Sequence, residues 1–200
     1  MANKEDIMIF AGSAHPELAK EISEILHIPL GKCSLSKFSD GEISVNITET
    51  VRGREVYIIQ PTGLPVNDNL MELCIMMDAM RRASVGKINA VIPYYGYARQ
   101  DRKAKPRDPI SAKLVADILV AAGADDIMTV DLHAPQIKGY FNIPVNHLEG
   151  MPVLAQYFLE RNFASKDLVK NIQEELKKIK PNYYQHLLKQ YQKIICEHIG

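Results

Sequence analysis

The stretch VYIIQPTGLPVNDNLMELCIMMDAMRRASVGKINAVIPYY, residues 56–95, decides the fold. Its two ends, 56–59 and 88–92, are short and almost continuously apolar, which is typical of parallel strands covered on both faces. Between them the spacing over 67–83 predicts a helix, whose apolar face carries Leu70, Leu73, Cys74, Met77 and Met80. A strand, a helix and a strand in this order predict a parallel βαβ unit.

The same alternation continues outward from this unit. Strands are expected at 7–11, 43–47 and 127–130, and helices at 16–26, 110–122 and 152–163. Asn67 or Asp68 is expected to cap the central helix. We therefore predict an α/β fold, with one parallel-sheet domain over residues 1–165 and a C-terminal α-helical extension over 166–200, where Pro181 separates two amphipathic stretches.

Composition excludes several classes of protein. Of the 200 residues, 46% are hydrophobic, which excludes general disorder. Lys plus Arg and Asp plus Glu number 24 each, so the net charge of zero gives no field for non-specific nucleic-acid binding. We expect no secretory signal, because residues 1–20 have no long apolar run and carry Glu5 and Asp6, and we find no apolar run of membrane-spanning length. Three distant cysteines favour free thiols, so we expect a cytoplasmic protein without nucleic-acid or membrane partners.

The common phosphate-binding and catalytic motifs are absent from the sequence. It contains no G-x-x-x-x-G-K-[ST], G-x-G-x-x-G, H-E-x-x-H, C-x-x-C or G-x-S-x-G. In parallel sheets, ligands bind beyond the carboxyl ends of the strands. The informative residues are therefore those that follow each strand, at 61–63, 95–108 and 131–133.

The strongest local feature is YYGYARQDRKAKPRDP, residues 94–109. Between Arg99 and Asp108 it carries five Lys or Arg and two Asp, a net charge of +3 in ten residues. At a strand end this composition favours a site for a polyanion, because one Arg guanidinium can donate two hydrogen bonds to the oxygens of a phosphate. Gln100 is suited to a base or ribose edge, and the tyrosines to stacking. The alternative interpretation is a solvated surface loop.

Two weaker motifs carry carboxylates. Asp131 and His133 lie two residues apart after a strand, so both side chains can point to one side and hold Mg²⁺, although a hydrogen-bonded structural pair fits equally well. Asp40 and Glu42, in the FSDGE turn of residues 38–42, have acceptors for a ribose or an adenine amino group, although a simple turn explains them too.

Together these segments resemble ribose-phosphate pyrophosphokinase, also called phosphoribosyl pyrophosphate (PRPP) synthetase, in its N-terminal domain. The matching stretches run in order along the chain: FSDGEISV (38–45), VRGREVYIIQPT (51–62), NDNLMELCIMMDAMRRAS (67–84), VIPYYGYARQDRK (91–103), PRDPISAKLVADIL (106–119) and DIMTVDLHAPQIKGYFNIPVNHL (126–148). The family transfers the pyrophosphoryl group of MgATP to the anomeric hydroxyl of ribose 5-phosphate. Its subunits have two α/β domains resembling type I phosphoribosyltransferases and assemble into hexamers.

The resemblance implies a role for each candidate site residue. Arg99 and Gln100 would contact ATP, with Asp101 nearby. The turn residues would reach the ATP of a neighbouring subunit, which implies a homo-oligomer: Phe38, Asp40, Gly41 and Glu42. His133 would coordinate the Mg²⁺ of MgATP, and Asp131 belongs to the same cation-linked motif.

The chain departs from the family pattern in two places. Asn142 and Asn146 replace the usual aspartates, which implies a weakened secondary cation or phosphate effector site. After residue 168 the resemblance stops. In the family a second domain binds ribose 5-phosphate with a Thr-rich loop, whereas residues 164–200 contain no Thr and one Ser, Ser165. We therefore expect this unrelated helical tail to replace the family's C-terminal domain and the chain alone to be inactive.

Three hypotheses for the function follow. The chain is an enzyme completed by a partner that supplies the second domain and with it the ribose 5-phosphate site. Alternatively, it is a non-catalytic subunit that binds nucleotide or joins oligomers of a full-length synthetase. In the third hypothesis it is a fragment that folds without a function.

Overall fold

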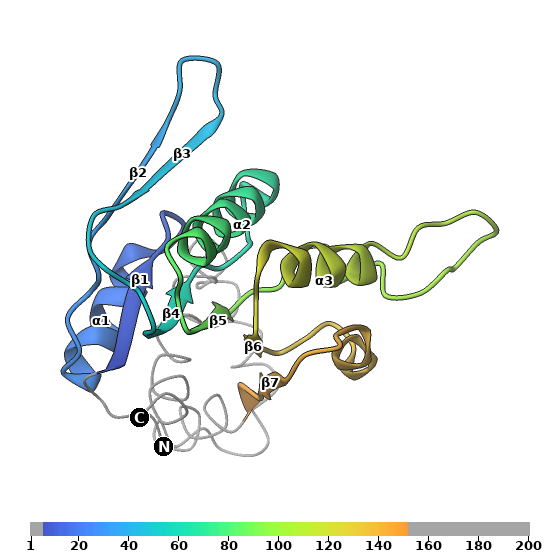
Figure 1. Ribbon diagram of the computed structural model, residues 1–200. Coiled ribbons are helices and arrows are strands. Elements are labelled where there is room, and N and C mark those ends of the chain that lie inside the picture. Colours follow the sequence, from blue (N-terminus) through green and yellow to red (C-terminus); the bar gives the residue numbers. More distant parts are fainter. Residues whose placement is uncertain (1–5, 152–200) are drawn as a thin grey trace, which may run out of the picture. The chain divides into compact units, whose positions relative to one another are not determined.

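A five-stranded parallel sheet forms the centre of the protein in the computed structural model, which describes residues 6–151 (Figure 1). The strand order is β1-β4-β5-β6-β7, and all neighbouring strands are parallel. The strands are β1 (Ile7–Ala11), β4 (Glu55–Ile59), β5 (Lys87–Ile92), β6 (Asp126–Val130) and β7 (Val145–Leu148). Parallel pairing gathers the carboxyl ends of all five strands at one edge of the sheet.

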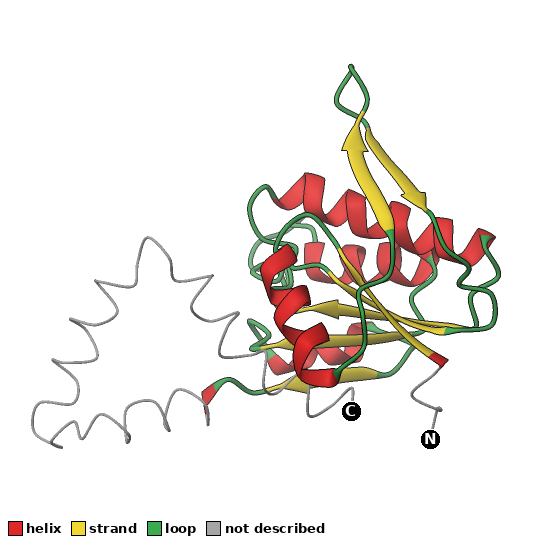
Figure 2. Ribbon diagram, turned by 90° about the vertical axis from the view of Figure 1, so that its left-hand side faces the viewer, coloured by secondary structure: helices red, strands yellow, loops and turns green. Residues whose placement is uncertain are grey.

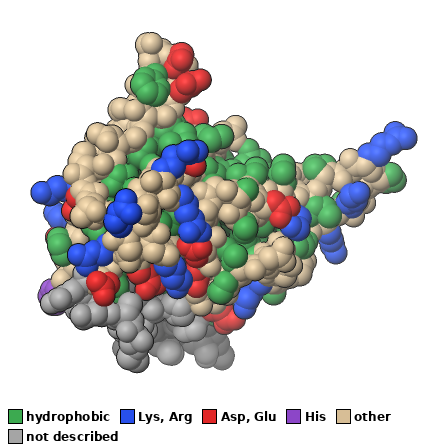
Figure 3. All heavy atoms as spheres, in the orientation of Figure 1, with side chains coloured by type: hydrophobic (Ala, Val, Ile, Leu, Met, Phe, Trp, Pro, Cys, Tyr) green, Lys and Arg blue, Asp and Glu red, His purple; other side chains and the backbone are tan. Residues whose placement is uncertain are grey.

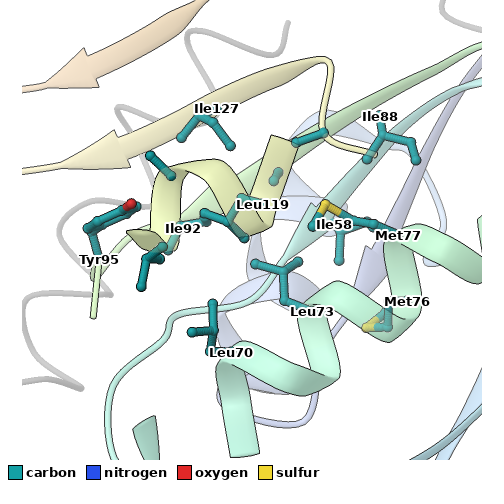
Figure 4. Close-up of a cluster of buried hydrophobic side chains, with 14 of the residues drawn as sticks. Ile58, Leu70, Leu73, Met76, Met77, Ile88, Ile92, Tyr95, Leu119 and Ile127 are labelled. Carbon is teal, nitrogen blue, oxygen red and sulfur yellow. The ribbon is translucent and has the colours of Figure 1, made fainter. Parts of the chain in front are cut away.

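Helices connect the strands. They are α1 (Pro16–Leu26), α2 (Val66–Arg82), α3 (Ser111–Ala122) and the 3₁₀ helix η2 (Pro135–Tyr140). Helices α2 and α3 form a layer over the sheet (Figure 2). Leu73 and Met77 of α2 and Leu119 of α3 pack with Ile58 and Ile88 of the sheet in one buried cluster (Figure 4). Helix α1 packs against β1.

A separate two-stranded hairpin projects from the body of the protein (Figure 1). Its strands are β2 (Cys33–Lys37) and β3 (Ile43–Ile47), paired antiparallel. The turn at its tip is closed by the Phe38 amide, which donates to the Glu42 carbonyl over 2.8 Å. Gly41 adopts a φ of +91°, which glycine reaches without strain. The hairpin packs on α2 and is tied to its first turn by an ion pair between Lys37 and Asp68.

The structure confirms the predicted α/β class and each predicted strand and helix within residues 6–151, to within one residue at each end. Strands β2 and β7 and helix η2 were not predicted. The cap prediction for α2 is wrong, because its N-cap is Pro65 and no side chain caps the helix. Asn67 instead accepts from the Tyr97 hydroxyl, and Asp68 pairs with Lys37.

Several predictions lie outside the described residues. These are the helix at 152–163, the helical tail over 166–200 and the domain boundary between them. Within residues 6–151, no helix is both long and apolar enough to cross a membrane.

Candidate functional site

The loops that follow β4, β5 and β6 begin at the carboxyl edge of the sheet, where parallel α/β proteins bind their ligands. The loop after β5 spans 93–110 and is the longest of the three. It divides into two parts with different contacts. We call residues 94–101 the anchored segment and residues 102–110 the cationic arm.

Hydrogen bonds to the start of α3 hold the anchored segment. The Tyr95 hydroxyl donates to the Ala112 carbonyl over 3.1 Å, and burial and the charge of Asp117 raise its pKa. The Gln100 carbonyl accepts from the Ala112 amide, also over 3.1 Å. The Gln100 side-chain oxygen accepts from the Ser111 hydroxyl over 2.6 Å. These bonds fix the backbone on either side of Arg99.

Asp101 lies at the end of the anchored segment and is buried, with 7% of its surface exposed. Its carboxylate accepts from the Gln136 amide, and its carbonyl accepts from the Tyr140 hydroxyl. Both donors belong to η2. These two hydrogen bonds therefore hold the loop after β5 against the segment after β6.

The cationic arm projects from the protein, and its Lys and Arg side chains reach solvent (Figure 3). Residues 102–109 hydrogen-bond only with one another in the described part of the chain, through Lys105 and Asp108. Neither Arg99 of the anchored segment nor any of the arm's four cations has an ion-pair partner within residues 6–151; the four are Arg102, Lys103, Lys105 and Arg107. Lys and Arg side chains on the helices and sheet, such as Lys87 and Lys113, do form ion pairs. The arm thus presents uncompensated positive charge.

Asp131 and His133 are both exposed just beyond β6. Asp131 adopts a φ of +44°, so the chain leaves the strand at this residue and strand alternation no longer decides where the two side chains point. The motif is braced by the Leu132 amide, which donates to Nε2 of His147 over 3.0 Å. Residues 6–151 contain no cluster of three or more His, Cys, Asp or Glu side chains suited to a metal.

The hairpin tip carries the other predicted nucleotide contacts and lies far from the cationic arm within one chain (Figure 1). Phe38 is 58% exposed, and Asp40 and Glu42 are also exposed. Figure 3 shows hydrophobic and acidic side chains together at the tip of the hairpin. Apart from the turn bonds, Asp40 accepts from the Glu42 amide over 3.2 Å. The structure therefore brings Arg99, Gln100 and Asp101 together and leaves the hairpin tip apart from them.

Polar side chains also line the sheet at its opposite edge. The Glu55 carboxylate accepts from Asn89 over 3.0 Å and from Lys87 over 3.2 Å. Although burial raises the pKa of Glu55, these bonds outweigh it and lower the pKa. Asn146 donates to Asp126 over 2.7 Å, a bond that an ionised aspartate at this position cannot donate, while Asn142 is exposed.

Sequence analysis named residues 61–63 as informative because they follow a strand, but it did not identify which side chains hold the anchored segment. All three side chains that contact it come from other segments: Thr62 from the loop after β4, and Gln136 and Tyr140 from η2. Their one signal in the sequence is position, since Thr62 lies in the loop after β4 and the other two lie in the segment between β6 and β7. Such contacts depend on how neighbouring loops meet in space, and no spacing along the chain encodes them.

A parallel sheet with a cationic loop at its carboxyl edge places the chain among α/β proteins whose ligand sites lie beyond the strand ends. Within that class, residues 7–123 match the family model described as the N-terminal domain of ribose phosphate pyrophosphokinase. The chain belongs to the ribose phosphate pyrophosphokinase family.

Individual relatives agree with this assignment. The chain is 65% identical over 174 residues to a ribose-phosphate pyrophosphokinase of Clostridium perfringens, covering 87% of this chain and 54% of the relative. It is 56% identical over 158 residues to that of Bacillus subtilis, covering 79% and 50%. The crystal structure of phosphoribosylpyrophosphate synthetase from Mycobacterium smegmatis superposes with a TM-score of 0.76 at 46% identity, covering 78% of this chain and 52% of that one. The chain thus spans about half the length of the relatives it matches.

Proposed function

We propose that this chain binds MgATP through the anchored segment and the cationic arm, as the nucleotide-binding half of a ribose-phosphate diphosphokinase. One observation carries the proposal: the exposed Arg99 has no ion-pair partner within residues 6–151, although its neighbours Ala98 and Asp101 are buried. An exposed guanidinium without an ion-pair partner is suited to binding phosphate, because it can donate two parallel hydrogen bonds to two phosphate oxygens.

The neighbouring residues divide the remaining tasks. Arg102 and Arg107 of the cationic arm add positive charge for the other phosphate groups. Gln100 uses its side-chain oxygen on Ser111, which leaves its amide nitrogen to donate to a base or ribose oxygen. Asp101 acts by positioning the loop rather than by touching ATP, because its carboxylate is buried against Gln136.

Asp131 and His133 would hold the Mg²⁺ that accompanies ATP. Two exposed side-chain donors fit an ion that keeps several waters and takes its other ligands from phosphate oxygens. Since the described residues include no cluster of three metal ligands, we expect the ion to bind with the nucleotide and not before it. When bound, it would neutralise charge on the phosphates.

A second copy of the chain would complete the nucleotide site. The acidic hairpin tip lies far from the cationic arm of its own chain (Figure 1), and its charge is opposite to that of the arm. Phe38, Asp40 and Glu42 would therefore contact ATP held by a neighbour, with Gly41 shaping the turn. Sedimentation with and without ATP tests this proposal, because ATP should then favour oligomers. Tight ATP binding by a strictly monomeric sample would contradict it.

The reaction that this site would serve is transfer of a pyrophosphoryl group. The anomeric hydroxyl of ribose 5-phosphate attacks the β-phosphorus of ATP, the bond from that phosphorus to the α-phosphate oxygen breaks, and AMP leaves. The chain's own residues would orient ATP for in-line attack and stabilise negative charge on its phosphates. A coupled assay for AMP, run on the chain alone and after mixing with a full-length synthetase, separates a catalytic from a non-catalytic subunit.

Calorimetry with ATP, ADP and Mg²⁺ tests nucleotide binding directly. Arg99→Ala should weaken binding by about 1.5–3 kcal/mol, as expected for a hydrogen bond to a charged group. Arg82→Ala is the matched control, because Arg82 is also exposed but pairs with Asp78 at the far end of α2. Equal ATP affinity in the wild type and Arg99→Ala would contradict the proposal.

A further inference from the structure

Thr62 lies on the short loop after β4, next to the loop that carries the anchored segment. Only 1% of its surface is exposed. Its hydroxyl donates to the Tyr94 carbonyl over 3.0 Å and accepts from the Gly96 amide over 2.7 Å. Its own amide also donates to the Tyr94 carbonyl, over 2.9 Å. One buried side chain therefore grips the anchored segment at two residues.

Gly96 is essential to this grip. A Cβ atom at residue 96 would lie 2.6 Å from the Thr62 carbonyl oxygen and 3.1 Å from its hydroxyl oxygen. Both distances are shorter than ordinary van der Waals contact, so the two backbones approach this closely only because residue 96 has no side chain. The pair Thr62 and Gly96 thus fixes the spacing between the loops after β4 and β5.

The grip lies immediately before the turn that contains Arg99. Residues 96–99 form this turn, and Gln100 after it is bound to the start of α3. The backbone of Arg99 is therefore held from both sides, by Thr62 before the turn and by Ser111 and Ala112 after it. Without the hydrogen bonds of Thr62, the backbone of Arg99 would still be held after the turn by the hydrogen bonds of Gln100.

We propose that Thr62 is a positioning residue for the nucleotide site and that its hydroxyl acts through Gly96 on Arg99. This inference rests on the proposed function, since it assigns Thr62 to the same ATP site. Thr62 does not touch the nucleotide in this role. Its hydroxyl holds the turn at 96–99 so that the Arg99 guanidinium meets phosphate without first ordering its own backbone.

Three substitutions separate positioning from general stability. Thr62→Val keeps the shape of the side chain and removes both hydrogen bonds, leaving the Gly96 amide unpaired. Thr62→Ser keeps the hydroxyl. Thr129→Val is the matched control, because Thr129 is also 1% exposed but its hydroxyl has no hydrogen-bond partner within residues 6–151.

Calorimetry with MgATP on the full chain gives the first readout. Thr62→Val should bind about tenfold more weakly than the wild type, the factor that corresponds to one buried hydrogen bond. Thr62→Ser should restore most of that affinity, and Thr129→Val should match the wild type. In an Arg99→Ala background, Thr62→Val should have little further effect, because the two residues act as a unit. Additive losses would overturn the proposal.

Amide hydrogen exchange gives a readout that needs no nucleotide. In Thr62→Val, exchange at residues 96–100 should accelerate while the strands of the sheet keep their protection; a rise throughout the protein would mean a merely structural role. Unchanged exchange at residue 96 would overturn the inference even if the chain binds ATP. Faster local exchange in a chain that binds no ATP would overturn the proposed function and the assignment of Thr62 to it.

Discussion

The anchored segment and the cationic arm are consecutive in the chain, yet they are held in opposite ways. Residues 94–101 are bound by the loops after β4 and β6 and by helices α2 and α3. Residues 102–109 hydrogen-bond only with one another in the described part of the chain. The first region therefore supplies fixed geometry and the second supplies exposed charge. Arg99 lies in the first region and shares the unpaired charge of the second.

The largest difference between the two regions should be in stability. Tyr95→Ala removes a buried ring that packs edge-on against Phe141, with the ring centroids 6.0 Å apart, and a hydroxyl bound to Ala112. Truncation of a buried aromatic side chain costs about 3–5 kcal/mol. Lys103→Ala in the arm should change the free energy of unfolding by less than about 0.5 kcal/mol.

Urea denaturation of both variants measures this difference. Tyr95→Phe separates the two contributions, since it keeps the ring and loses the hydrogen bond to the Ala112 carbonyl, at a cost of about 0.5–1.5 kcal/mol. Equal losses from Tyr95→Ala and Lys103→Ala would mean that the anchored segment contributes no more to the fold than the arm does.

A pair of aspartates sharpens the comparison. Asp101→Ala removes the hydrogen bond that the buried Asp101 carboxylate accepts from the Gln136 amide and should cost about 1.5–3 kcal/mol, as expected for a hydrogen bond to a charged group. Asp108→Ala removes a bond to the Lys105 amide on the exposed arm and should cost less than about 0.5 kcal/mol. Thermal and urea unfolding would rank the two variants. The reverse order would show that the arm, not η2, fixes the loop.

How far the sequence predicts the molecule follows the same division. Apolar spacing predicted β4, α2 and β5, because each of these elements buries apolar side chains that recur at the spacing of a strand or a helix. It did not predict β2, in which the alternation is short: only Cys33 and Leu35 are apolar and half-buried, and the other three residues, Ser34, Ser36 and Lys37, are exposed. The hairpin forms because β3 provides a partner and α2 provides a surface, and both are tertiary effects.

The site divides likewise. Charge density predicted the cationic arm, and strand ends predicted the loops that carry Arg99 and Asp131. The grip of Thr62 and the burial of Asp101 could not be predicted, since each depends on two loops meeting at the edge of the sheet. Sequence indicates where charge gathers, whereas the hydrogen bonds that orient that charge require the fold.

The opposite edge of the sheet extends the comparison to pH. The lowered pKa of Glu55 means that its contacts stabilise the fold above its ordinary value of 4.5 and that this contribution is lost as the pH falls through the lowered value. Glu55→Gln should therefore flatten the loss of stability in acid. Urea midpoints from neutral to acid pH measure the slope, and parallel curves for the variant and the wild type would contradict the expectation.

The smallest effect should come from the arm itself. Lys103 and Lys105 lie two residues apart in sequence, so they repel each other about as strongly in the unfolded chain as in the folded one. Their combined replacement by Gln should leave the free energy of unfolding within about 0.5 kcal/mol of the wild type. Lys113→Gln is the matched control, because its ion pair with Asp117 exists only when α3 is folded. Loss of this ion pair should lower the free energy of unfolding by about 0.3–0.5 kcal/mol. The effect should vanish in about 1 M salt, where the Debye length is about 3 Å. The arm variant should match the wild type at both salt concentrations. A salt-dependent loss in the arm variant would mean that the arm's charges have partners in the fold, and the contrast between the two regions would then fail.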